Sequence, residues 1–273
     1  MLLRARVVTA FLALAPLLGI PAQAQQAAPS PAAPSDLALA KAVHNPFEDF
    51  LKVPIQATTG FNVGSNHSAG EAINVEPLIP INLTPKWDLM LRPSMTLVYL
   101  PSPDAQFGLS DSQLSAFLTP ENASTWIWGV GPIFQFPTAS STDLGSGKWC
   151  AGPTGAVVYN GTHWFNAILA YHLMSFAGAK HRGSVNTTYI EPEISYNLDS
   201  GWYAQIDPPI SYDWTAQKRN AWVLPVGADV GDVLDLGEHM SIQLGAYDFV
   251  EHPQGGPGWM IRAEVTLLFP TTR

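Results

Sequence analysis

Cysteine, charge and long hydrophobic runs are all scarce in this sequence. The 273 residues include one cysteine, and 13% are charged, against roughly 25% in an ordinary soluble domain. A single cysteine excludes an internal disulfide, so we expect Cys150 to be a small buried residue. A net charge of −9 excludes the basic surface that nucleic-acid binding requires. Beyond the first two dozen positions no run of about 18 apolar residues occurs, which argues against helical membrane spans.

The first residues have the features of an export signal. Arg4 and Arg6 precede an apolar stretch over residues 7–20, and Ala22-Gln23-Ala24 follows it. A positive region, a short apolar region and an Ala-x-Ala site in this order predict a secretory signal peptide. We therefore predict that residues 1–24 are removed by cleavage after Ala24.

Residues 25–52 are predicted to be a linker that contains one short helix. Their first part is rich in Pro, Ala and Ser, and such a composition cannot bury enough surface to order itself. Asp36 is a suitable N-cap for a helix that runs to His44, and Asn45-Pro46 stops it.

From residue 53 to residue 270, apolar and polar side chains alternate with period two, as in strands that have one apolar and one polar face. Between residues 87 and 99, for example, Trp87 and Leu89 fall in one phase while Asp88 and Arg92 fall in the other. The pattern marks twelve segments: 53–63, 72–83, 87–99, 110–118, 124–137, 148–159, 162–176, 187–198, 201–214, 220–233, 238–249 and 258–269. We predict an all-β fold, an antiparallel transmembrane β-barrel of about 12 strands with a short N-terminal helix.

The connections and the aromatic residues favour an outer-membrane barrel over a secreted β-sandwich. Short connections alternate with longer polar ones, as periplasmic turns and outer loops do. A sandwich also alternates, but lysine and glutamate would then be frequent on its polar face, where Gly, Asn, Ser, Tyr and Gln dominate here. Aromatic residues gather in the apolar phase near segment ends, like the interfacial girdles of a barrel: Trp87, Tyr99, Trp126, Trp149, Tyr159, Trp202, Trp214, Trp222, Trp259 and Phe269.

Prolines inside the predicted strands fit this pattern less well. Each of them removes a hydrogen bond from the ladder between strands. We expect bulges that bend the wall at Pro77, Pro93, Pro132, Pro153, Pro192 and Pro208.

Several short stretches resemble one family of bacterial outer-membrane proteins. They include LAKAVHNP (39–46), WGVGP (128–132), LGSGKW (144–149), SFAG (175–178) and the closing TLLFP (266–270). The family is labelled as phenol-degradation meta-pathway proteins or simply as transporters, and is sometimes mislabelled neuromedin U. The resemblance covers nearly all of the mature chain. It implies a channel-like barrel in the outer membrane that passes aromatic or other small molecules.

In a barrel the polar phase of the strands would line the lumen. Its charged residues are mostly acidic, which predicts a negative potential that disfavours anions. A barrel of this size is wider than an eight-stranded one and narrower than the large porins, so we expect a constricted passage, partly occluded at its periplasmic mouth by residues 36–51. The candidate solute-lining residues are Glu76, Arg92, Tyr189, Glu191, Glu193, Tyr203, Asp207, Asp213, Arg262 and Glu264. Alternatively, these charges form a buried salt-bridge network that only stabilises the wall.

We expect no enzymatic activity, catalytic residue, metal site or cofactor. The expected partners are outer-membrane lipid, small-molecule solutes and, during biogenesis, the barrel-assembly machinery, with no role for nucleic acid. A structural barrel without a transport role is one alternative. Another is a lipid-modifying hydrolase, since such an enzyme needs a nucleophile and a base near the outer rim, and the predicted outer loops contain His67, His181, His252, Ser65, Ser68, Ser184 and Asp143.

Overall fold

The structure, a computed structural model, describes residues 35–47, 50–101, 104–121, 125–235 and 239–270. The predicted signal peptide lies outside these residues. In chain order the elements are α1 (Asp36–His44), β1 (Phe50–Val63), β2 (Ser68–Val75), β3 (Ile79–Thr84), β4 (Trp87–Leu100), β5 (Gln106–Leu109), β6 (Ser112–Pro120), β7 (Trp126–Phe136), β8 (Lys148–Asn160), β9 (Trp164–Gly178), β10 (Asn186–Asn197), β11 (Tyr203–Ile206), β12 (Ile210–Asp213), the 3-10 helix η1 (Lys218–Asn220), β13 (Trp222–Asp235), β14 (His239–Glu251) and β15 (Trp259–Pro270).

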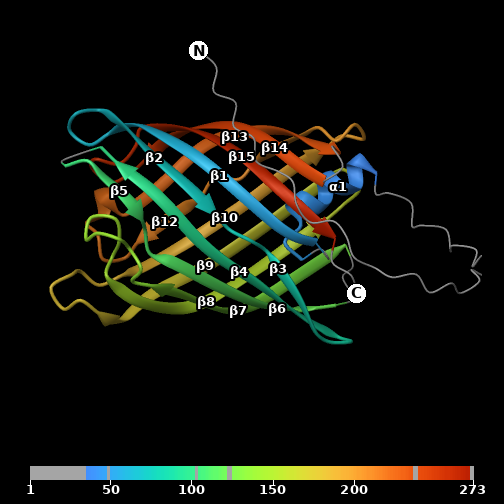
Figure 1. The fold of residues 1–273 in the computed structure, drawn as a ribbon, viewed down its shortest axis with the longest axis horizontal. Coiled ribbons are helices and arrows are strands. Elements are labelled where there is room, and N and C mark those ends of the chain that lie inside the picture. Colours follow the sequence, from blue (N-terminus) through green and yellow to red (C-terminus); the bar gives the residue numbers. More distant parts are fainter. Residues whose placement is uncertain (1–34, 48–49, 102–103, 122–124, 236–238, 271–273) are drawn as a thin grey trace, which may run out of the picture. The chain divides into compact units, whose positions relative to one another are not determined.

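The strands form one closed antiparallel barrel (Figure 1). Strand β1 pairs with β15 from Phe50 opposite Pro270 to Phe61 opposite Trp259, which joins the two ends of the sheet. At three places two strands follow one another along a single position in the wall: β2 and β3, β5 and β6, and β11 and β12. In each case both strands pair with the same neighbouring strand. The fifteen strands therefore fill 12 wall positions, and the predicted barrel is confirmed.

The six prolines at which bulges were expected do not shift the register between the strands, whereas the register does shift next to Pro225. Strand β10 pairs with β12 up to Ile190 and with β11 from Ile194, and the gap between them contains Pro192 and Pro208. The prediction of bulges at the prolines is wrong, because a residue without an N–H removes a hydrogen bond but adds no residue to the strand. Pairing likewise resumes in the same register across Pro77, Pro93, Pro132 and Pro153.

The outer face of the barrel is apolar and its inner face is largely polar. Ile168, Val157 and Val230 lie within strands and are exposed by 57%, 50% and 51%. Soluble domains show the reverse distribution, with few polar side chains fully buried. Here the buried side chains include Ser115, Thr119, Gln135, Thr154, Ser195, Gln205, Asp229, Gln243, Arg262 and Thr266. The alternation therefore predicted correctly which phase faces outward.

The connections between strands lie at two ends of the barrel. We call one the turn end: it contains the connections after β3, β6, β8, β10 and β13, together with the start of β1 and the end of β15. The other is the loop end, with the connections after β1, β4, β7, β9, β12 and β14. Exposed tryptophans lie near both ends, as expected for two girdles. Those near the turn end are Trp87, Trp126, Trp128, Trp164 and Trp202, and those near the loop end are Trp149, Trp214, Trp222 and Trp259.

Helix α1 begins one residue earlier than its predicted cap implies. The Oγ of Ser35 accepts a hydrogen bond from the backbone N of Ala38 at 3.2 Å. Ser35 is therefore the N-cap in place of Asp36, which lies in the first turn, where an acidic side chain complements the helix dipole. No helix of the described residues is long and apolar enough to span a membrane.

Helix α1 lies at the end of the barrel where β15 ends (Figure 1) and packs against lumen-facing side chains. Leu39 and Ala40 form a buried cluster with Tyr203 of β11 and Val233 of β13. Because the neighbours of Tyr203 along β11 face outward, this contact places the helix inside the wall. Helix α1 therefore fills part of the lumen.

Candidate functional site: a charged cavity in the barrel lumen

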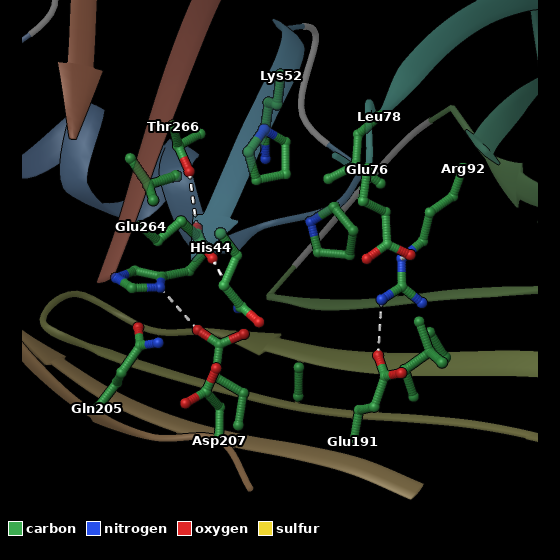
Figure 2. A pocket seen from close by; sticks show the side chains of 18 of the residues that line it. His44, Lys52, Glu76, Leu78, Arg92, Glu191, Gln205, Asp207, Glu264 and Thr266 are labelled. Atoms are coloured by element: carbon green, nitrogen blue, oxygen red, sulfur yellow. Dashed lines mark hydrogen bonds and ion pairs between the residues drawn. The ribbon is translucent and has the colours of Figure 1, made fainter. Parts of the chain in front are cut away.

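A cavity of about 340 Å³ lies in the lumen beyond the end of α1. Side chains from ten strands and from residues 43–47 line it, and Figure 2 shows them converging from both sides of the barrel. Seven of the predicted solute-lining residues border this cavity: Glu76, Arg92, Glu191, Glu193, Asp207, Arg262 and Glu264.

The first charged group of the cavity is centred on Arg92 of β4. Its Nε lies 2.7 Å from Oε1 of Glu76, and its Nη2 lies 2.8 Å from Oε2 of Glu191. Glu191 belongs to β10, which does not pair with β4, so this ion pair reaches across the lumen (Figure 2). The arrangement ties two separate parts of the wall together.

The second charged group is centred on Arg262 of β15. Its Nε donates to Oδ1 of the fully buried Asp229 at 3.0 Å, and its Nη2 also pairs with Asp207. The hydroxyl of Tyr247 donates to Oδ1 of Asp207 at 2.7 Å, and the guanidinium lies 4.8 Å from the centre of the Tyr247 ring. These contacts satisfy Arg262 on several sides, as a buried charge requires.

His44, the last residue of α1, fixes the helix to the wall. Its Nδ1 lies 2.7 Å from Oε1 of Glu193, and its Nε2 lies 3.1 Å from Oγ of Ser195. The edge of its ring meets the ring of Tyr203, with the centres 4.6 Å apart. Three wall side chains thus hold the end of α1 that borders the cavity, in line with the expected partial occlusion.

The other three predicted solute-lining residues lie outside the cavity. Tyr203 packs against α1, and its hydroxyl donates to Oε1 of Gln243 at 3.1 Å. Tyr189 stacks on Tyr171 nearer the loop end, with ring centres 4.6 Å apart. Asp213 ends β12 and accepts hydrogen bonds from the backbone and side chain of Thr215.

Sequence reasoning missed several residues that border the cavity. Gln205 is in phase with Asp207 on the lumen side, so the alternation contained a signal for it. Lys52, whose Nζ donates to the carbonyl oxygen of Asn45, also lies in the polar phase. His44 gave no such signal, because it belongs to a helix that only tertiary contacts bring into the barrel.

The three loop histidines lie on separate connections at the loop end. His67 follows β1, His181 lies between β9 and β10, and His252 lies between β14 and β15. Nδ1 of His252 lies 3.0 Å from the carbonyl oxygen of Pro253. Within the described ranges, no three His, Cys, Asp or Glu side chains are grouped so that they could hold a metal ion.

No protein-family model matches the chain, and no curated protein matches it. Its fold is similar to that of solved structures. An outer membrane channel from Pseudomonas putida F1 has a TM-score of 0.60 and 16% identity, over 81% of this chain and 94% of that chain. Outer membrane phospholipase A from Escherichia coli has a TM-score of 0.48 and 12% identity, over 87% of this chain and 98% of that chain. A Pseudomonas aeruginosa FadL homologue has a TM-score of 0.44 and 9% identity, over 86% of this chain and 92% of that chain. At these identities the similarity to the channel shows a shared outer-membrane barrel fold and does not extend to solutes.

Proposed function

We propose that the protein is an outer-membrane channel-like barrel for the passive passage of small solutes. The observation that carries this proposal is the inverted distribution of its side chains, with an apolar exterior around a charged cavity. The family that the sequence resembles favours aromatic or hydrophobic solutes. The acidic excess of the cavity favours cations over anions.

The exterior supports a membrane location. Apolar side chains cover the middle of the strands and tryptophans lie near both ends, as lipid and its two interfaces require. We propose that the barrel lies in the bacterial outer membrane, because the predicted signal peptide would export the chain. The turn end would then face the periplasm. Lipid and the barrel-assembly machinery are the partners that such a location implies.

Helix α1 narrows the lumen, so passage should depend on how firmly the helix is held. The contacts of His44 with Glu193 and Ser195 hold the helix in place, so we expect His44→Ala to increase conductance. Single-channel recording in planar bilayers measures this, with His252→Ala at the loop end as the matched control. An unchanged conductance in His44→Ala would contradict a role of the helix in restricting passage.

Ion selectivity tests the role of the cavity. The wild-type protein should conduct cations better than anions, and Glu191→Gln with Glu193→Gln should reduce this preference. Glu251→Gln removes an exposed carboxylate at the loop end and should leave selectivity unchanged. Complete absence of conductance from folded protein would refute the proposed passage.

The alternatives predict different results in the same preparation. A hydrolase would release fatty acid from phospholipid vesicles and lose this activity in His181→Ala or His252→Ala. A purely structural barrel would neither conduct nor hydrolyse. We expect conductance without hydrolysis.

A further inference from the structure

The walls of the lumen cavity differ in chemistry on its two sides. The side formed by β10, β11 and β15 presents carboxylates and an amide. The other side presents an apolar patch of Phe47, Met90, Phe117 and Leu169, which belong to the segment after α1 and to β4, β6 and β9, with the charged Lys52, Glu76 and Arg92 beside it. A ligand with a polar end and an apolar end would match both kinds of lining.

The cavity has more negative charge than its cations balance, because three basic side chains, Lys52, Arg92 and Arg262, line it together with five carboxylates: Glu76, Glu191, Glu193, Asp207 and Glu264. Arg92 and Arg262 each face two carboxylates. Glu264 accepts hydrogen bonds from two uncharged groups, Nε2 of Gln56 at 3.0 Å and Oγ1 of Thr266 at 2.9 Å. Glu264 is partly buried, and a carboxylate with reduced access to water favours a cationic partner, because desolvating a charge is costly.

Gln205 provides a second and independent indication. Its side chain is 5% exposed, and its Oε1 has no hydrogen-bond partner among the residues that the structure describes. It borders the cavity, and Figure 2 shows its amide directed toward His44. A buried acceptor without a donor is destabilising, so a ligand that donates a hydrogen bond here would remove that penalty.

We propose that this cavity binds a small organic cation that has a primary ammonium head and a short aromatic or alkyl body. An ammonium has three donors and no acceptor, and Glu193, Glu264 and Gln205 offer acceptors on the polar side. The apolar side chains opposite would cover the body. The volume of about 340 Å³ is at the small end of ligand sites, roughly 300–1,000 Å³. This inference rests on the proposed function and names the class of solute that the passage would hold.

Isothermal titration of the full chain in detergent tests the site without a membrane. The probes are phenethylamine, its neutral analogue 2-phenylethanol, and the anion phenylacetate. We expect the amine to bind about tenfold more tightly than the alcohol, as a hydrogen bond to a charged group allows, and phenylacetate to bind more weakly still. Equal affinity for the amine and the alcohol would overturn the proposal. So would a titration in which Ca²⁺ binds and the amine does not.

Two variants locate the binding. Glu264→Gln keeps the shape of the side chain and should weaken amine binding about tenfold without affecting the alcohol. Gln205→Leu removes the unpartnered oxygen and should weaken the amine as well, while the exposed Glu251→Gln is the matched control. A heat-dependent shift in gel mobility confirms that each variant is folded. Wild-type amine affinity in both cavity variants would refute the assigned site.

The same titrations separate this inference from the proposed passage. Conductance in bilayers without a preference for the amine would refute the binding site and leave the passage standing. Preferential amine binding without conductance would refute the passage and retain the site.

Discussion

Loss of Arg262 should destabilise the barrel strongly because it leaves Asp229 buried without a countercharge. The side chain of Arg262 is 4% exposed and that of Asp229 is 0% exposed. Removing one partner of a buried ion pair costs about 3–5 kcal/mol. The side chain of Asp207, the other carboxylate of the group, is 25% exposed and can regain water. We therefore expect Arg262→Gln to lower the free energy of unfolding by about 3–5 kcal/mol, almost entirely through Asp229.

A double variant tests this assignment. Arg262→Gln with Asp229→Asn replaces the buried pair by two neutral amides, so most of the lost stability should return, to within about 1–2 kcal/mol of wild type. Urea titration in phospholipid vesicles, followed by tryptophan fluorescence, gives the unfolding free energy. Arg219→Gln, in the exposed η1 turn, is the control. A loss under about 1 kcal/mol for Arg262→Gln, the size of a surface pair, would refute the reasoning, as would a double variant no more stable than the single one.

Two substitutions test the packing of the wall and its lipid face in the same assay. A Cβ on Gly152 would overlap the backbone carbonyl of His172, whereas a Cβ on Gly183 would meet nothing within 4 Å. Gly152→Ala should therefore lower the free energy of unfolding by about 1–3 kcal/mol, and Gly183→Ala should change it little. Equal stability of the two variants would show that the strands can separate freely at Gly152. Ile168 lies within β9 and is 57% exposed, so Ile168→Arg should cost about 2–4 kcal/mol in bilayers, while Ser184→Arg in the β9–β10 connection should be neutral. A neutral result for Ile168→Arg would show that this face is not in contact with lipid.

The alternation of side chains was sufficient to predict the barrel. Which face a strand residue occupies depends on its own position in a period of two, so the sequence specifies it locally. The twelve predicted segments correspond to the 12 wall positions, and even Pro192 and Pro208 did not shift the register. Two predicted segments, 72–83 and 201–214, each comprise two short strands separated at prolines, because a missing N–H breaks a ladder in a way that hydrophobic periodicity does not record. Strand β5 lies before the predicted segment 110–118, so that prediction missed it.

The contents of the lumen depended on contacts between strands that are distant in the sequence. Arg92 and Glu191 are separated by 99 positions, and no local pattern indicates that they meet. Tyr203 and Glu193 are both lumen-facing and both contact α1, yet only Glu193 also borders the cavity. The sequence by itself thus determined the barrel and its inner face, because alternation is local. Only the tertiary structure decided that α1 enters the lumen and which inner side chains surround the cavity, because closure brings remote strands together.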